Sequence, residues 1–204
     1  MDNIISKFLK IPTACFSDSM QGLNNMDSTI KPLKEDFVVA GRAFTVKIPV
    51  GDNKAVLRAI NEANPGDVLV IDAKGDTYRA IAGDFIVGLA QSLGINGIIA
   101  DGVIRDVQGV KKLNYPVFCK GTTVAASAKS GWGEMNIPIS CGGVAVKPGD
   151  IVVGDADGVV IIPQEREKEI LKLAQEKLRK DEEREAQISG NHEEIRRFLN
   201  QMTK

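Results

Sequence analysis

The segment GDFIVGLAQSLGINGIIADGVIRD, residues 83–106, contains a helical pattern that is followed directly by a short strand pattern. Residues 83–93 are predicted to form a helix whose first turn carries Gly83 and Asp84. Residues 94–101 follow as a short and nearly all-apolar strand. A strand of this kind is typical of a sheet that is covered on both faces. The segment therefore predicts an α/β fold.

Helix and strand patterns continue on both sides of this segment. We expect Asp101-Gly102 to turn the chain after the apolar strand. The other predicted elements of this region are strands at 37–50, 68–72 and 115–125, and helices at 53–63 and from 107 onward.

The first 25 residues suggest a helical cover. The pattern from Ile4 to about Asn25 predicts a short helix and then a second one. We expect the second helix to start within SDSMQGL, with Ser17 or Asp18 as its N-cap.

Two stretches of the chain resemble each other. NPGDVLVIDAKGD at 64–76 and KPGDIVVGDADGV at 147–159 both place Pro-Gly-Asp before a β-branched run. A turn followed by a strand explains both stretches without a repeat architecture.

The composition changes abruptly after Pro163. Residues 164–189 are charged and helical in pattern and are expected to stop at Gly190-Asn191, before a final short helix. We therefore divide the chain into an α/β domain, 1–163, and a C-terminal helical extension, 164–204. One stripe of the long helix is apolar at first and then acidic: Leu171, Ala174, Leu178, Asp181, Glu185 and Ile188. Its acidic end is either a solvated end or a group that reaches a partner subunit's site.

Composition excludes several classes of protein. The 204 residues include 26 Lys+Arg and 27 Asp+Glu, a formal net charge of −1, which argues against nucleic-acid binding. The N-terminus is too polar for a signal peptide, and no run approaches the roughly 18 apolar residues of a membrane span. We expect a soluble cytoplasmic protein with neither nucleic-acid nor membrane partners.

Cysteine and histidine are too sparse for several common chemistries. Cys15, Cys119 and Cys141 are far apart without a CxxC pair, so each is expected to be a small buried hydrophobe. The single histidine, His192, argues against a histidine-rich metal site, a Ser-His-Asp triad and a Cys-His dyad. If the protein is an enzyme, its acid, base and metal chemistry falls mainly to carboxylates, arginine, lysine and backbone groups, with a hard cation such as Mg²⁺ or Mn²⁺ as any metal.

The 83–106 segment also holds the strongest candidate site. The predicted helix start at Gly83, Asp84, Phe85 and Ile86 presents free backbone N–H groups that suit a carboxylate or phosphate. Arg105 and Asp106 lie just beyond the next strand, where sites in α/β sheets gather. Arginine can bind a carboxylate and the aspartate can hold a hard cation. The same pair could also be an ordinary helix cap with a surface ion pair.

These motifs carry a resemblance to a known family. Gly83-Asp84-Phe85-Ile86, Ala100-Asp101-Gly102 and Arg105-Asp106 together resemble the RraA-like family, over roughly residues 12–163. The family includes the 4-hydroxy-4-methyl-2-oxoglutarate aldolases, which are class II pyruvate aldolases. The resemblance implies a sandwich of the swivelling β/β/α type, assembled as a homotrimer or homohexamer with sites between subunits.

The resemblance also implies a reaction and roles for the motif residues. Relatives cleave 4-hydroxy-2-oxo acids to pyruvate and a second oxo acid, and many decarboxylate oxaloacetate. Asp106 would hold the divalent metal, Mg²⁺ or Mn²⁺, and Arg105 would contact the keto oxygen of the small 2-oxo acid substrate. Backbone N–H groups of Gly83 through Ile86 would bind the pyruvyl carboxylate, and Asp84 would orient a metal-bound water.

The sequence departs from the aldolase pattern in one place. In that branch Arg-Asp is usually followed, after two intervening residues, by Glu or Asp, whereas here Val107-Gln108 lead to Gly109. The branch also supplies a glutamate from the C-terminal helix of an adjacent subunit. The candidates here are Asp181, Glu182, Glu183 and Glu185, and the sequence does not rank them.

A binding protein is the competing hypothesis, because the namesake branch of the family inhibits ribonuclease E by protein contact. Those relatives resemble shorter chains without a long C-terminal helix, so residues 164–204 favour the enzyme. A methyltransferase is set aside, because no glycine-rich fingerprint for a methyl donor is present.

Overall fold

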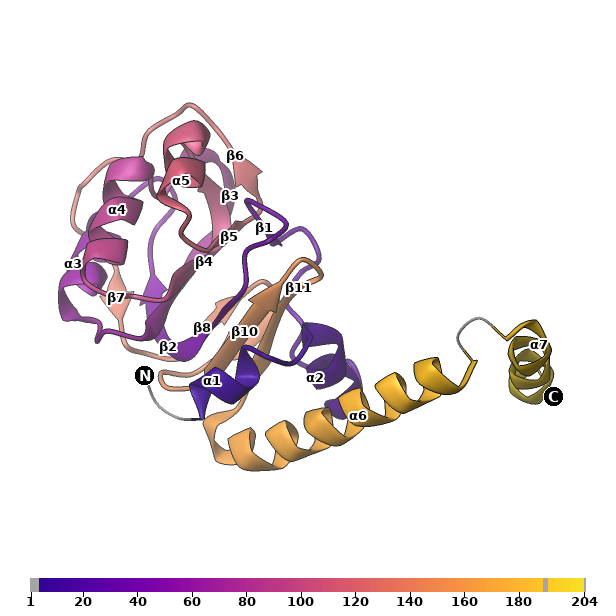
Figure 1. The fold of residues 1–204 in the computed structure, drawn as a ribbon. Coiled ribbons are helices and arrows are strands. Elements are labelled where there is room, and N and C mark those ends of the chain that lie inside the picture. Colours follow the sequence, from indigo (N-terminus) through magenta and orange to yellow (C-terminus); the bar gives the residue numbers. More distant parts are fainter. Residues whose placement is uncertain (1–3, 189–190, 204) are drawn as a thin grey trace.

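The computed structural model describes residues 4–188 and 191–203 (Figure 1). The helices are α1 (Ile5–Phe8), α2 (Thr13–Ser19), α3 (Lys54–Glu62), α4 (Asp84–Ser92), α5 (Val107–Leu113), the 3-10 turn η1 (Gln164–Arg166), α6 (Glu167–Ile188) and α7 (His192–Met202). The strands are β1 (Lys31–Pro32), β2 (Val39–Lys47), β3 (Asp67–Ala80), β4 (Gly97–Ile104), β5 (Val117–Cys119), β6 (Gly121–Thr122), β7 (Glu134–Met135), β8 (Ile139–Cys141), β9 (Val144–Val146), β10 (Ile151–Asp155) and β11 (Gly158–Ile162).

One large sheet organises the molecule, with the strand order β1-β5-β4-β3-β2-β10-β11. Strands β2, β3, β4 and β5 are parallel neighbours, and β10 and β11 extend the sheet in antiparallel fashion. Helices α3, α4 and α5 connect the successive parallel strands, as parallel pairing requires a crossover. The predicted α/β fold is confirmed.

Apolar side chains of the central strands alternate between two cores. In β3, Leu69 and Ile71 belong to the core beneath α3, α4 and α5, which cover one face of the sheet (Figure 1). Their neighbours Val68 and Val70 belong to a second core, shared with the β8–β9 hairpin. Successive strand residues point to opposite faces, so a strand buried on both must be almost wholly apolar.

A third core joins the two ends of the chain. Phe8 and Phe16 stack with ring centroids 5.4 Å apart, and they share this core with β10, β11 and the first half of α6. Ile170 and Ala174 of α6 are fully buried there. The second half of α6 projects beyond the body of the molecule (Figure 1). Gly190, part of the expected helix stop, lies outside the described residues, and α6 ends at Ile188.

The predicted start of the second helix is wrong. Helix α2 begins at Thr13, so SDSMQGL contains its end rather than its beginning. Thr13 donates to the Asp155 carboxylate from its backbone N–H (2.8 Å) and from its hydroxyl (2.7 Å). The hydrogen-bond acceptor for the first turn of α2 thus lies 142 positions away in the chain, so no local sequence pattern reveals where the helix begins.

The predicted turn at Asp101-Gly102 is also wrong, because β4 continues through both residues to Ile104. Lys120 holds the Asp101 carboxylate at 2.7 Å, so a charge is accommodated inside the strand. Beyond Asp101, β4 pairs with β6 and with the irregular second half of β3.

The two Pro-Gly-Asp stretches are turns before strands, as predicted. Gly66 and Gly149 have φ of +95° and +86°, which favours glycine. In each stretch the following aspartate, Asp67 or Asp150, accepts a hydrogen bond from the N–H three residues earlier. Strands β3 and β10 then run on either side of β2.

The three cysteines are buried and free, as expected for small hydrophobes. Burial raises the pKa of the Cys15, Cys119 and Cys141 thiols, which keeps them protonated. Along the described part of the chain, no helix is both long enough and apolar enough to cross a bilayer.

Asp155→Ala is expected to lower the free energy of unfolding by about 1–2 kcal/mol, because the first turn of α2 loses its acceptor. Asp157→Ala is the control, since its side chain is exposed in the same hairpin. Urea denaturation followed by circular dichroism measures both changes. Equal stabilities of the two variants would contradict a capping role for Asp155.

Candidate active site

Three successive strand-to-helix connections converge at one edge of the sheet. The carboxyl ends of β2, β3 and β4 lead into α3, α4 and α5, whose N-cap residues are Asn53, Gly83 and Asp106. Because these strands are parallel neighbours, their connections lie at the same edge. Binding sites of open α/β sheets form at this position.

A pocket of about 200 Å³ lies between these connections, and all three N-cap residues line it. Residues of the 126–129 loop also line it. The lining residues are Asn53, Ala80, Ala82, Gly83, Phe85, Ile86, Arg105, Asp106, Ala126, Ser127 and Lys129.

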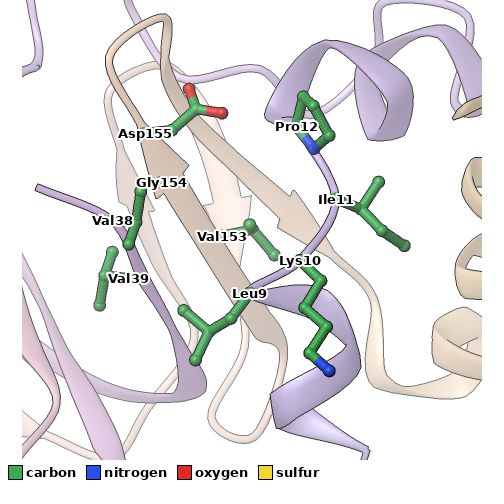
Figure 2. A pocket seen from close by; sticks show the side chains of 9 residues that line it. All are labelled: Leu9, Lys10, Ile11, Pro12, Val38, Val39, Val153, Gly154 and Asp155. Atoms are coloured by element: carbon green, nitrogen blue, oxygen red, sulfur yellow. The ribbon is translucent and has the colours of Figure 1, made fainter. Parts of the chain in front are cut away.

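Figure 2 shows a different hollow, between residues 9–12, residues 38–39 and β10. Its visible side chains are mainly aliphatic. Its carboxylate, Asp155, already accepts both hydrogen bonds from Thr13. It therefore offers less chemistry than the pocket at the strand ends.

Arg105 and Asp106 form the charged end of the pocket. The Arg105 Nε atom lies 3.3 Å from Asp106 Oδ2, and both side chains are about two-fifths exposed, at 41% and 43%. Asp106 has φ of +58°, and its carboxylate faces Gly83, where an added Cβ would collide with Oδ2. The backbone N–H of Arg105 donates to Ala82 O at 3.0 Å, which ties the two connections together. Only glycine at position 83 admits this close approach.

The structure brings five of the six proposed site residues to the pocket, and Asp84 lies beside it. The Asp84 Oδ1 atom accepts from the backbone N–H of Phe85 at 2.7 Å. The rest of its carboxylate fills the space that a Cβ on Gly109 would need. The glycine that departs from the aldolase pattern therefore gives room to Asp84.

The donor set fits a hard cation that is bound by few protein ligands. No group of three or more His, Cys, Asp or Glu side chains suited to a metal occurs within residues 4–188 and 191–203. Asp106 is a single, partly exposed carboxylate at the pocket. Mg²⁺ typically takes one or two carboxylates and completes its shell with water and substrate oxygens, so Asp106 is compatible with such an ion.

Asn53, Ser127 and Lys129 were missed at the sequence level. Asn53 could have been found, because it precedes the helix after β2 just as Gly83 and Asp106 precede the next two helices. No signal marks Ser127 or Lys129, which the long connection after β6 carries to the pocket.

The buried carboxylate of Asp52 holds that connection in place. It accepts from the backbone N–H groups of Lys54 (2.9 Å), Gly131 (3.2 Å) and Ser130. Burial raises the pKa of Asp52, but these three hydrogen bonds outweigh it and place the pKa below its usual value. The backbone of Asn53 also donates to Ala128 O at 3.0 Å.

Comparison with known proteins places the chain in a family. The model of the family described as RraA-like, Aldolase/RraA, matches residues 13–161. The chain belongs to the RraA-like family. The resemblance drawn from the 83–106 motifs is thereby confirmed, and so is the α/β fold that it implied.

Relatives of this RraA-like chain include a protein of Halalkalibacterium halodurans named "Putative 4-hydroxy-4-methyl-2-oxoglutarate aldolase". It is 56% identical over 200 residues, which cover 98% of this chain and 95% of that protein. Its name supports an aldolase.

Two solved RraA structures are also similar. Streptomyces coelicolor RraAS2, described as an unusual member of the RNase ES inhibitor RraA family, has a TM-score of 0.82 at 30% identity, covering 92% of this chain and 99% of that one. A Thermus RraA, described as an RNA-processing inhibitor, has a TM-score of 0.69 at 27% identity, covering 75% and 93%. Since RraAS2 matches most of this chain, length alone does not separate the two branches.

Gly109→Ala is expected to destabilise the protein by about 1–3 kcal/mol, because the new methyl group would overlap the Asp84 carboxylate. Gly88→Ala in α4 is the matched control. The nearest atom to its Cβ would be Leu113 Cδ1 at 3.9 Å, so alanine should stabilise by about 0.5–1 kcal/mol. Urea denaturation of both variants measures whether each substitution lowers or raises the free energy of unfolding. Equal stabilisation would show that Asp84 does not need the space beside residue 109.

Asp52→Asn should lower the free energy of unfolding at pH 7 by about 1–3 kcal/mol, because the charged acceptor of three N–H groups is lost. A lowered pKa in the folded state means that Asp52 contributes stability above its unfolded pKa, and this contribution disappears as pH falls through the folded pKa. The gap between wild type and variant should therefore shrink from pH 5 downward. Urea denaturation at pH 7, 5 and 3 checks this, and a gap independent of pH would refute it.

Proposed function

We propose that this RraA-like chain is a divalent-metal-dependent class II pyruvate aldolase of the 4-hydroxy-4-methyl-2-oxoglutarate type. It would cleave 4-hydroxy-2-oxo acids to pyruvate and a second oxo acid and would also decarboxylate oxaloacetate. The observation that carries the proposal is the convergence of the α4 start, Arg105 and Asp106 in one pocket. The aldolase name of a 56% identical relative supports it.

The first turn of α4 would bind the pyruvyl carboxylate. Gly83, Phe85 and Ile86 line the pocket where the helix presents its positive end. Within that turn the N–H of Phe85 is shared with the Asp84 carboxylate. The remaining N–H groups are the proposed partners of the substrate.

Arg105 would stabilise the negative charge that develops on the substrate's keto oxygen. Its guanidinium is already oriented by Asp106 at 3.3 Å. A preformed charge at this position lowers the barrier without reorganisation during the reaction.

Asp106 would hold Mg²⁺ or Mn²⁺. A bound divalent cation supplies Lewis-acid polarisation of the 2-oxo acid. The role of Asp106 itself is to fix a negative oxygen ligand beside Arg105 and against Gly83.

Bond cleavage needs a base as well. The hydroxyl on C4 loses its proton and becomes a carbonyl, while the electrons of the C3–C4 bond form the enolate of pyruvate next to Arg105. Protonation of the enolate at C3 then gives pyruvate. We assign the removal of this proton to a water oriented by Asp84, whose carboxylate accepts from the backbone N–H of Phe85 and lies against Gly109.

An acidic residue from a neighbouring subunit would share that task in a homotrimer or homohexamer. The tip of α6 extends away from its own body (Figure 1). Asp181 is paired with Lys177 and Arg184, and Glu183 with Arg179. Glu182 and Glu185 carry no ion pair within the described residues, so we favour these two as the donated carboxylates.

A regulator of ribonuclease E is the second candidate. The 92% coverage of this chain by Streptomyces RraAS2 favours it, since that protein belongs to the RNase ES inhibitor family. A regulator requires no catalytic turnover, whereas an aldolase must turn over its substrate.

Purified protein should release pyruvate from 4-hydroxy-4-methyl-2-oxoglutarate and from oxaloacetate. EDTA should abolish release, and added Mg²⁺ or Mn²⁺ should restore it above the rate of metal alone. Arg105→Ala should lower kcat/KM by about 10²–10³-fold while metal binding persists. Asp106→Ala should lose both turnover and metal dependence. A coupled lactate dehydrogenase assay measures pyruvate.

Two results would contradict this proposal. The first is full activity of a folded, metal-stripped Asp106→Ala oligomer. The second is the absence of turnover with both substrates together with inhibition of ribonuclease E, which would establish the regulator instead.

A further inference from the structure

Two buried polar atoms of the pocket have no hydrogen-bond partner within the described residues. They are Asn53 Oδ1, on a side chain that is only 5% exposed, and Ser127 Oγ. Both residues line the pocket that contains Arg105 and Asp106. An unpaired polar atom in a buried position is destabilising, so these atoms point to a ligand.

The orientation of the Asn53 amide is determined by its other end. The Asn53 Nδ2 atom donates to Ile81 O at 3.0 Å, so the amide nitrogen is engaged and the oxygen is left without a partner within the described residues. Asn53 is the N-cap of α3, yet its side chain makes no hydrogen bond to that helix. The pocket is therefore offered a pure hydrogen-bond acceptor at this point.

Ser127 adds a group of different character. Its hydroxyl can donate as well as accept. A ligand hydroxyl, which donates one hydrogen bond and accepts another, is complementary to the pair. A carboxylate is not, because its oxygens only accept and would face the amide oxygen of Asn53.

We propose that Asn53, together with Ser127, binds the C4 hydroxyl of the substrate and so selects 4-hydroxy-2-oxo acids over 2-oxo acids without that hydroxyl. The inference rests on the proposed aldolase function. In the proposed function Arg105 and Gly83 bind the C1–C2 end of the substrate, and Asn53 and the 126–129 loop line the same pocket. Three alanines, Ala80, Ala82 and Ala126, leave room for the other substituents on C4.

The position of the 126–129 loop depends on the segment before α3. Asp52 accepts hydrogen bonds from Ser130 and Gly131, and Asn53 itself donates from its backbone to Ala128. Asp52 and Asn53 thus hold the loop that carries Ser127 by hydrogen bonds, and Asn53 also provides the acceptor.

The test compares two reactions that share the pyruvate enolate. Cleavage of 4-hydroxy-2-oxoglutarate involves the C4 hydroxyl, whereas oxaloacetate carries a carboxylate at C4 instead. In Asn53→Ala, the ratio of kcat/KM for 4-hydroxy-2-oxoglutarate to that for oxaloacetate should fall at least about tenfold, as loss of one hydrogen bond implies. Asn53→Ser should show the same fall, since serine suits the start of α3 but is too short to replace the amide.

Asn96→Ala is the matched control, because the Asn96 amide also donates to a backbone carbonyl, Ala40 O at 3.0 Å, but lies outside the pocket. In Asn96→Ala the ratio of kcat/KM for 4-hydroxy-2-oxoglutarate to that for oxaloacetate should equal the wild-type ratio. In the wild type, 2-oxoglutarate, which lacks only the hydroxyl, should inhibit competitively with a Ki at least about tenfold above the Kd of the 4-hydroxy acid.

An equal fall with both substrates in the Asn53 variants would overturn the inference and leave Asn53 a structural residue. Equally tight binding of 2-oxoglutarate and its 4-hydroxy derivative to wild type would overturn it without any variant. Absence of metal-dependent turnover in the wild type would instead refute the aldolase function, and the selection of a C4 hydroxyl would fall with it.

Discussion

Burial of β3 and β4 on both faces is the constraint on which the rest of the structure depends. Alternate residues of these strands pack under α3, α4 and α5 or against the β8–β9 hairpin. Strands with two apolar faces need cover on both sides. The connecting helices that parallel pairing requires cover one face, and the β8–β9 hairpin covers the other. The same arrangement leaves three connections open at the carboxyl edge of the sheet, where the pocket forms.

The charged end of the pocket follows from close packing between two of these connections. Gly83 admits the carboxylate of Asp106, and Gly109 admits that of Asp84. Two glycines thus determine where two carboxylates lie. The absence of a side chain at 109, which departs from the aldolase pattern in the sequence, leaves the space that the Asp84 carboxylate occupies.

Sequence patterns predicted the elements whose stabilising contacts are local or strictly periodic. Helices α3, α4 and α5 were found because their apolar faces recur at helical spacing and their strands are almost wholly apolar. The errors occurred where a distant partner decides. Helix α2 begins at Thr13, where Asp155 accepts from the first backbone N–H. Asp101 lies within a strand, although Asp-Gly is typical of a turn, because Lys120 pairs with its carboxylate. Arg105, Asp106 and Gly83 were predicted together because one segment carries them. Asn53 and Ser127 come from distant segments, and only Asn53 has a signal in the sequence, its position before a helix that follows a strand.

The three helix starts at the pocket share a further property. The side chains of Asn53 and Asp106 make no capping hydrogen bond to their own helices, and Gly83 has none to offer. At α7, by contrast, Asn191 accepts from Glu193 and Glu194 in the ordinary way. A side-chain cap is worth about 0.5–2 kcal/mol, and at α3 and α4 neighbouring carboxylates supply part of it, since Asp52 accepts from the N–H of Lys54 and Asp84 from the N–H of Phe85. An N-cap residue without a capping side chain is not peculiar to the pocket, because α1 and α2 begin in the same way. What distinguishes the pocket is that Asn53 could cap α3 but instead keeps a buried amide oxygen unpaired within the described residues. A local rule that fails where a capable side chain is present is the better mark of functional constraint.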